Sequence, residues 1–392
     1  MAHVLMGFAE ALAAPEAFFS LHRAGHRVSV FAREGARGPM LSRLPLAGVH
    51  HLPAPERAAA PALAALDRIV EAVTPDVVLP LDDPGLWLID RVLGADRRLA
   101  GGRGPAVAMA LDKTRQIEAA NDAGLTPPAT LVVRAPGDLD EAAQFPAIAK
   151  PARAVGLTPD GSRLAKGGVT YLADRAAARA LARTLGDDMA PLLVQPLIRG
   201  TGEGIFGFAG AQGVSHLSAH RRLRMMNPHG SGSSACMAIA PDPALTRPVA
   251  QMIAAIGWRG PFMVEFLRGT DGTAWFMEIN GRMWGSMALA RAQDLEYPAW
   301  AVAQVLEPDF APPAVAPPTG PLTARHLGRE LLHLAFVARG PKDDFHRQDW
   351  PRLLPSLAAV LRPAHRAYNT DPDFPGFAWR EALHTVRGVL RR

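Results

Sequence analysis

Two glutamates in the stretch 261–284, PFMVEFLRGTDGTAWFMEINGRMW, have a spacing that suits metal binding. Two β-rich runs flank Asp271-Gly272, a dipeptide typical of a two-residue hairpin turn. A turn centred there pairs Glu265 directly with Glu278 on one face of the hairpin. Asn280 shares that face, because side chains alternate between the two faces of a strand. The hairpin therefore presents two carboxylates and an amide together.

The opposite face of the hairpin is apolar, and we expect it to be buried so that the carboxylates face a cleft. That face collects Phe262, Val264, Phe266, Trp275, Met277 and Ile279. Like charges at opposed positions repel, and a hard divalent cation between them would relieve the repulsion. Two carboxylates and an amide oxygen suit Mg²⁺, which completes its shell with water and substrate phosphates. The hairpin thus predicts a Mg²⁺ site beside a phosphate, with Mn²⁺ as an alternative metal; two solvated glutamates are the competing interpretation.

Composition limits the class of protein. A chain of 392 residues is too long for one compact core and predicts two or three domains. Apolar residues make up 48% and charged residues 20%, as in soluble globular proteins, and no apolar stretch is long enough to span a membrane. The single cysteine, Cys236, excludes an internal disulfide framework and fits a reducing, cytoplasmic location. The net charge of +5 comes from scattered arginines without a basic stripe, which favours small anionic substrates over nucleic acid.

The elements that must position the hairpin begin with a parallel α/β unit over residues 1–108. Three β-rich runs alternate there with two amphipathic stretches, which is typical of a Rossmann-like sheet. We expect strands at 3–8, 26–31 and 76–81, and helices at 15–24 and 61–73. Asp82 and Asp83 follow the third of these strands, at the edge where open sheets bind ligands. A simple turn is the alternative interpretation of these two residues.

Residues 109–305 predict a two-lobed α+β domain, with lobes at about 109–191 and 192–305. Asp112 is placed to cap a helix from Lys113 to about Ala123, and Gly124 ends it. Further helices are expected at 174–185 and 248–256. A proline-rich linker at 306–321 and a helical extension at 322–392 complete the chain.

The hairpin residues resemble the signature of the ATP-grasp superfamily, in its carboxylate-amine ligase type. That signature is a strand glutamate, then a second glutamate followed at two-residue steps by asparagine and a basic residue, matched here by Glu265, Glu278, Asn280 and Arg282. In the family the first three hold Mg²⁺ ions that bridge the ATP phosphates, and the arginine steadies the transferred phosphoryl group. Gly281 stands where the family usually has proline. The resemblance implies an ATP-grasp fold with an N-terminal pre-ATP-grasp domain.

The resemblance extends upstream to the nucleotide site. Lys113, which opens its helix, and Lys150, in AIAKPA, resemble the family's two phosphate-binding lysines. The run 192–198, LLVQPLI, resembles the hinge that reads adenine, where Gln195 replaces the usual acid and the N–H of Ile198 would be the adenine donor.

Three further segments resemble parts of the site. Glu203 matches an acidic residue that binds ribose hydroxyls, with a loop glutamate as the alternative. The glycine-rich stretch 155–168 resembles the phosphate-covering lid, with an ordinary surface loop as the alternative. A strand carrying Arg221 and Arg222, followed by a Gly/Ser loop at 230–234, resembles the acceptor side, where one of these arginines would pair with a substrate carboxylate, with a surface face as the alternative.

The resemblance implies an ATP- and Mg²⁺-dependent ligase that activates the carboxylate of a small molecule as an acyl phosphate, which an amine then captures. No nucleic-acid or membrane partner is expected, and the sequence leaves the oligomeric state open, with a dimer as one option. A non-catalytic ATP-binding module is one alternative. A dinucleotide-dependent oxidoreductase is another, since Gly202, Gly204 and Gly207 spell GxGxxG, although they lie far from the first strand–helix turn.

Overall fold

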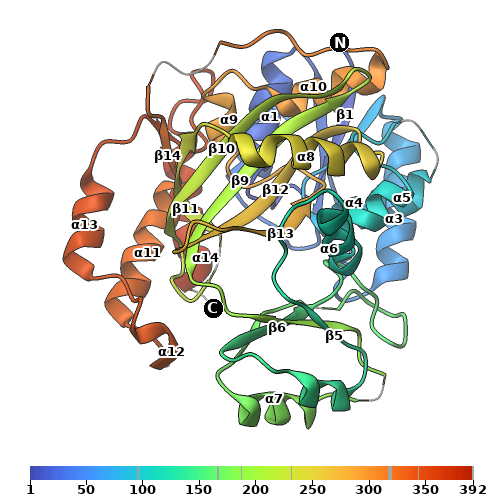
Figure 1. Ribbon diagram of the computed structural model, residues 1–392. Helices are drawn as coiled ribbons and strands as arrows, with labels where there is room; N and C mark the ends of the chain where they lie inside the picture. Colours follow the sequence, from blue (N-terminus) through green and yellow to red (C-terminus); the bar gives the residue numbers. More distant parts are fainter. Residues whose placement is uncertain are drawn as a thin grey trace.

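A computed structural model shows a large upper body, a small lobe below it and a group of helices at one side (Figure 1). The structure describes residues 1–94, 96, 98–165, 167–186, 188–230, 232–316, 320–342 and 344–390. No helix among these residues is long and apolar enough to cross a membrane.

The N-terminal unit is a parallel sheet covered by helices, as predicted. Its strands follow the order β3-β2-β1-β4. The elements are β1 His3–Gly7, α1 Ala14–Arg23, β2 Arg27–Arg33, α2 Pro39–Arg43, β3 Gly48–Leu52, α3 Ala59–Val73, β4 Val77–Pro80 and α4 Asp83–Leu93. The sequence reading missed β3, α2 and α4, so Asp82 and Asp83 follow a fourth strand of this unit. β3 was missed because its residues alternate between half-buried and exposed and include two histidines.

The chain order creates a switch point between β1 and β4. From β1 the chain moves to β2 on one side, and it returns later to place β4 on the other side. The carboxyl ends of β1 and β4 therefore flank a crevice, which is where open α/β sheets bind ligands.

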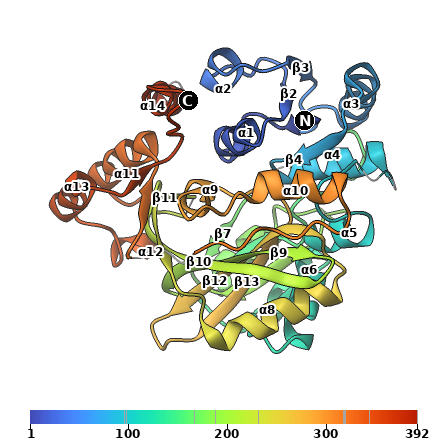
Figure 2. The same cartoon turned by 90° about the horizontal axis from the view of Figure 1, so that it is seen from above.

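The central sheet carries the hairpin and follows the order β13-β12-β9-β10-β11-β14-β15. Its longer strands are β9 Gly200–Gly210, β10 Gly213–Met225, β11 Ser233–Ile239, β12 Gly260–Gly269 and β13 Ala274–Asn280. One face packs against α5 Pro105–Ala110, α6 Lys113–Asp122 and α8 Pro243–Ala255. The other face packs against α9 Met287–Arg291, α10 Tyr297–Leu306 and the N-terminal unit, as Figure 2 shows from above.

The hairpin β12–β13 has the predicted pairing of Glu265 with Glu278, but the predicted turn is wrong. The loop has three residues, because the N–H of Gly269 donates to the carbonyl of Thr273 and Gly272 adopts a φ of +85°. This geometry shifts the register by one residue near the turn, and a bulge beside Glu278 restores it.

The same bulge changes which side chains form the apolar face. Phe276 packs there with Phe266, Val264 and Ile279, whereas the predicted Trp275 and Met277 are only partly buried. The face packs against α6 and α8, and the carboxylates point to the opposite side, as expected.

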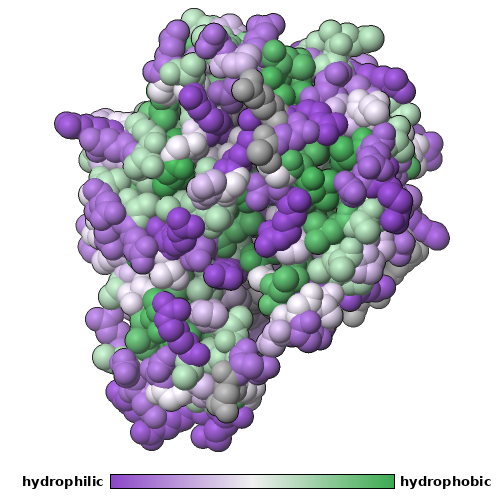
Figure 3. Space-filling model, turned by 90° about the vertical axis from the view of Figure 1, so that its right-hand side faces the viewer, coloured by the Kyte–Doolittle hydropathy of each residue, from purple (hydrophilic) through white to green (hydrophobic). Residues whose placement is uncertain are grey.

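The small lobe is a separate antiparallel sheet with its own apolar core. Its elements are β5 Leu131–Val133, the 3-10 helix η1 Pro136–Glu141, β6 Ala147–Pro151, β7 Thr170–Leu172, α7 Arg175–Ala182 and β8 Leu192–Pro196. In Figure 3 this lobe protrudes below the body, and polar residues are spread over the surface of both parts.

The C-terminal extension contributes strands as well as the predicted helices. Residues 307–316 form no helix or strand, and the chain then adds β14 Thr323–Arg325 and β15 Arg366–Ala367 to the edge of the central sheet beyond β11. The helices are α11 Leu327–Arg339, α12 Asp344–Arg347, α13 Leu353–Leu361 and α14 Phe377–Leu390. α11 and α14 pack together beside β11 (Figure 2). The extension is therefore built into the central sheet.

Candidate active site

A cavity of about 290 Å³ lies where the switch point of the N-terminal sheet faces the central sheet. Leu81 and Asp82, which follow β4, line one side of it. Arg222 of β10 and Glu265 of β12 line the other side, with Arg282 next to them. Residues from distant parts of the sequence thus converge on one cavity.

Both hairpin carboxylates are paired with cations. Arg222 Nη2 lies 2.6 Å from Glu265 Oε2, and Lys113 Nζ lies 2.9 Å from Glu278 Oε2. Asn280 Nδ2 donates to Glu265 Oε1 at 3.3 Å. Each of the opposed glutamates therefore has a cationic side chain of its own beside it, which offsets part of their mutual repulsion.

The electrostatics of Glu278 show how strongly its neighbours favour the charged form. Burial alone would raise the pKa of this carboxyl, but Lys113, Lys150 and Arg282 together hold it below its usual value. The carboxylate is therefore available as an anionic ligand at neutral pH.

The donor set fits a magnesium ion that shares its shell with a phosphate ligand. Among the described residues, no group of three or more His, Cys, Asp or Glu side chains is placed to hold a metal. Glu265, Glu278 and Asn280 supply only two carboxylates and one amide. Such a set suits Mg²⁺, which keeps several water or phosphate oxygens, better than a metal enclosed by protein ligands.

Two lysines approach the hairpin, Lys113 from α6, which packs on the central sheet, and Lys150 from the small lobe. Lys113 is the first residue of α6, whose N-terminus is capped by Asp112, as predicted. Lys150 is buried in β6 of the small lobe. Burial and the neighbouring Lys113 lower the pKa of Lys150 to about 8, and no carboxylate of the described chain lies within ion-pairing distance of it. A buried ammonium without a partner suits a phosphate ligand.

Gln195 shares one face of the small-lobe sheet with Lys150. It lies on β8 opposite Ile148, two residues before Lys150 on β6, so both side chains point away from the lobe's own core. Gln195 Nε2 donates to Thr130 Oγ1 at 2.8 Å, while its buried Oε1 has no partner in the described part of the chain. Ile198 follows in the short segment that connects the small lobe to β9.

Arg282 reaches across to the N-terminal unit. Its Nε donates to Asp83 Oδ1 at 3.3 Å, so Asp83 contacts Arg282 while Asp82 lines the cavity. The preceding Gly281 is required by close packing: a Cβ there would lie 2.6 Å from the Trp258 ring and 2.8 Å from Ala110 Cβ. This contact explains why neither proline nor any larger residue stands at that position.

The sequence reading gave no role to His220, which lines the cavity. Its Nδ1 lies 2.8 Å from Ser286 Oγ, and its buried Nε2 has no partner among the described residues. Burial, with a smaller effect of Arg222, lowers the pKa of His220 to about 3, so the ring is neutral. Strand alternation was the available signal, since His220 lies two residues before Arg222.

The structure does not bring Glu203 or Arg221 to this cavity, and both line another one, beside α8. Strand alternation places Arg221 and Arg222 on opposite faces of β10, and Glu203 lies opposite Arg221 on β9. Glu203 accepts from Arg221 at 2.8 Å and from Arg268 at 3.0 Å, on the face that α8 covers. Arg222 is therefore the arginine of the predicted pair that faces the cavity.

The GxGxxG glycines lie inside β9, which rules out a dinucleotide-binding turn there. They make room for neighbouring side chains instead. A Cβ on Gly202 would lie 2.7 Å from Arg222 Cδ, and one on Gly204 would lie 3.0 Å from His220 Nε2. These glycines let two cavity-lining side chains lie close over the sheet.

The glycine-rich stretch 155–168 packs against the N-terminal unit. The N–H of Leu164 donates to the carbonyl of Pro55, and the N–H of Ala59 donates to that of Ser162. Val155 and Leu164 are buried in the apolar core beside α3 and α4. Lys166 of this stretch lies outside the described residues.

No protein-family model and no curated protein sequence matches the chain. Many solved structures are similar to it, and three of them serve as examples. They are an L-amino acid ligase from Bacillus licheniformis (18% identity, TM-score 0.61, 78% of this chain and 73% of that chain), a biotin carboxylase from Campylobacter jejuni (14%, 0.64, 82% and 75%) and an N5-carboxyaminoimidazole synthetase from Staphylococcus aureus (15%, 0.61, 84% and 83%). The likeness in fold thus extends over most of each chain.

Proposed function

Because the chain has the ATP-grasp fold, we propose that it is an ATP- and Mg²⁺-dependent ligase that activates a carboxylate as an acyl phosphate for capture by an amine. One observation carries this proposal: a cavity with Arg222 and Arg282 in its wall adjoins paired glutamates that two lysines approach. Acyl-phosphate chemistry needs this juxtaposition of a triphosphate site and an anion-binding cavity.

The nucleotide would lie between the small lobe and the hairpin. Lys150 lacks an anionic partner and suits a phosphate, and Gln195 Oε1 is a buried acceptor without a donor. An exocyclic amino group of adenine would supply that donor, and the N–H of Ile198 would serve as a donor to the ring. Both side chains face the same side of one sheet, which supports a single ligand.

Glu265, Glu278 and Asn280 would hold Mg²⁺ beside the phosphates. When bound, the ion supplies charge neutralisation and orients the phosphate oxygens. Lys113 and Arg222, which are ion-paired with the two glutamates, lie within reach of the same region and add positive charge around it. This set of charges suits phosphoryl transfer, which depends mainly on positioning and electrostatic stabilisation.

The proposed reaction has two steps. An oxygen of the substrate carboxylate forms a bond to the γ-phosphorus of ATP as the bond to the ADP oxygen breaks. An amine nitrogen then attacks the acyl carbon, phosphate leaves with the carbon–oxygen electron pair, and the nitrogen loses a proton to solvent. Arg282 stabilises the negative charge near the transferred group, and no protein nucleophile is required.

The test is ADP formation that depends on an added carboxylic acid. The full chain would be incubated with ATP, Mg²⁺ and panels of acids and amines, and hydroxylamine would trap an acyl phosphate as a hydroxamate. We expect ADP and hydroxamate to appear together with at least one acid. ATP binding without acid-dependent ADP across the panels would instead identify a non-catalytic ATP-binding module.

A further inference from the structure

Arg329 brings the C-terminal extension into the candidate active site. It lies on α11 and lines the 290 Å³ cavity together with Arg222, Glu265 and Arg282. A second cavity of about 220 Å³, between α2 and α14, shares Arg329 with the first, as well as Ala11 and Leu12. This arginine therefore stands where two adjoining cavities meet.

Arg329 differs from the other arginines of the cavity in its charge balance. Arg222 is paired with Glu265, and Arg282 is paired with Asp83. Among the described residues, no carboxylate lies within ion-pairing distance of Arg329, whose Nη1 donates only to the carbonyl of Ser233 at 3.3 Å.

The carboxylate of Glu381 is already engaged near Arg329. Its Oε2 lies 3.1 Å from His326 Nε2 and accepts from Thr385 Oγ1 at 3.0 Å. Burial lowers the pKa of Arg329, which is the expected sign for a guanidinium whose lost hydration is not compensated. An anionic ligand would supply the missing compensation.

Small residues allow this arginine to reach the cavity. A Cβ on Gly232, in the loop predicted to lie on the acceptor side, would lie 2.5 Å from Arg329 Nη1. A Cβ on Gly328 would lie 2.7 Å from the carbonyl oxygen of Ala382 on α14. Close packing of α11 on α14 and a glycine beneath the guanidinium thus fix the position of Arg329.

We propose that Arg329 binds a substrate carboxylate other than the one that is activated. The carboxylate to be activated must lie at the Mg²⁺-binding hairpin, whereas Arg329 enters the same cavity from α11, next to the second cavity. That one carboxylate is activated is part of the proposed function, and this inference rests on it. The second carboxylate comes either from a dicarboxylic acid or from an amino-acid acceptor, and both present the planar anion that a guanidinium binds.

The test measures binding rather than turnover. Calorimetry on the full chain with Mg²⁺ and a non-hydrolysable ATP analogue would compare dicarboxylic acids with their monoamides, and α-amino acids with their amides. We expect at least one carboxylate to bind about tenfold or more tightly than its amide, the range of a charge-assisted hydrogen bond. The arm that shows the preference identifies the source of the carboxylate.

Three variants decide whether Arg329 causes that preference. Arg329→Gln should reduce the ratio of affinities to about one while the ATP analogue still binds, and Arg329→Lys should restore part of it. Arg339→Gln, which removes an exposed charge from the same helix, should leave the ratio unchanged. The proposal is overturned if the unmodified chain shows no preference, or if Arg329→Gln keeps it. A preference that depends on Arg329 without acid-dependent ADP formation would contradict the proposed function alone.

Discussion

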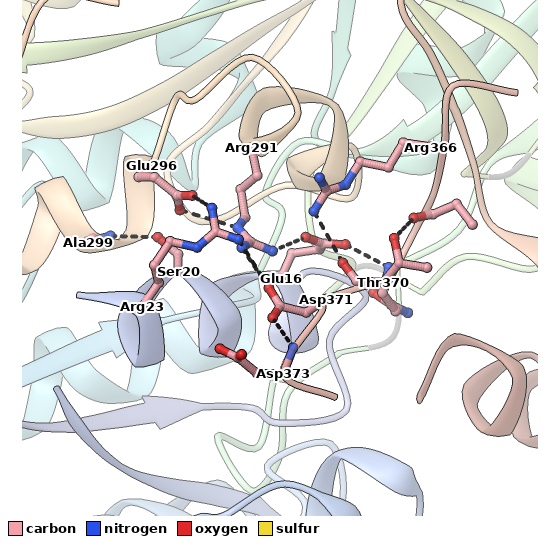
Figure 4. Close-up of polar contacts among 12 residues, drawn as sticks. Glu16, Ser20, Arg23, Arg291, Glu296, Ala299, Arg366, Thr370, Asp371 and Asp373 are labelled. Atoms are coloured by element: carbon pink, nitrogen blue, oxygen red, sulfur yellow. Dashed lines mark hydrogen bonds and ion pairs between the residues drawn. The ribbon is translucent and has the colours of Figure 1, made fainter. Parts of the chain in front are cut away.

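Two clusters of buried charge in this molecule have opposite designs. Around Arg291, whose side chain is fully buried, every guanidinium nitrogen has a carboxylate partner: Glu16 at 2.7 Å, and Glu296 and Asp371 at 3.2 Å (Figure 4). Arg23 also pairs with Glu296 and Asp371. This cluster joins α1 of the N-terminal unit, the start of α10 and the C-terminal extension, and it is saturated.

The cleft at the hairpin is unsaturated by comparison. Lys150 and Arg329 have no carboxylate within ion-pairing distance among the described residues, and Gln195 Oε1 and His220 Nε2 have no hydrogen-bond partner there. A cavity lies beside this cleft. Buried charge alone therefore gives no reason to expect a ligand. Unused hydrogen-bonding capacity at a cavity wall, as at His220 and Arg329, does give one, because a ligand can use it.

Glu278→Gln should abolish most activity at the hairpin and leave the fold intact. We expect acid-dependent ADP formation to fall by about 10³-fold, because the substitution removes a charged ligand from the proposed metal site. The thermal midpoint should change little, because the Lys113 and Glu278 side chains of the lost ion pair keep 19% and 32% of their surface exposed. Turnover like that of the unmodified chain would contradict the metal assignment.

Arg291→Met should disrupt the saturated cluster, and we expect it to lower stability without affecting ligand binding. Removing the cation leaves Glu16 and Asp371 buried without compensation, which we expect to destabilise the chain by about 3–5 kcal/mol. Urea denaturation followed by fluorescence would measure the loss. ATP-analogue binding by the remaining folded protein should be normal, and a selective loss of that binding would show that this cluster belongs to the site.

Arg222→Gln and Arg221→Gln form a matched pair that sharpens the comparison. The two residues are adjacent, but Arg222 faces the cavity and Arg221 faces the side covered by α8. We expect the first change to lower kcat/KM for the acid by about 10²-fold and the second to alter it less than about twofold. Equal effects would contradict the separation of these arginines by the sheet.

For Lys150 we expect a smaller effect, a fall in ATP affinity that depends on pH. Because its pKa is lowered to about 8, the side chain is protonated below that pH and loses its charge above it. ATP affinity should therefore fall above about pH 8, by up to about tenfold, and Lys150→Arg should abolish the fall. Calorimetric titrations between pH 7 and about pH 9.5 would show it, and an identical fall in the variant would assign the titration to another group.

The sequence predicted the features that local pattern determines. Alternation and a turn signal were enough to place Glu265 opposite Glu278, although the true loop is longer and a bulge compensates for it. The cap of Asp112 likewise fixed the start of the helix that carries Lys113. Such features depend on neighbours a few residues away along the chain or directly across one hairpin.

Features that depend on contacts between distant segments were not predictable in the same way. The residues near Arg291 in the sequence do not predict that it pairs with Glu16 and Asp371. Arg329 likewise lies in a helix whose packing against the cavity follows from β14 joining β11, which hydrophobic periodicity does not encode. The choice between Arg221 and Arg222 stayed open because the phase of β10 becomes clear only from its pairing with β9.

The lining of the cavity has a consequence for biosynthesis. Its wall includes Ala11 near the start of the chain and Tyr368 near the end. During vectorial translation the pocket cannot close until Tyr368 has left the ribosome exit tunnel. A nascent polypeptide that stalls before this point carries Lys113, Lys150 and the hairpin glutamates without a closed wall around this cavity.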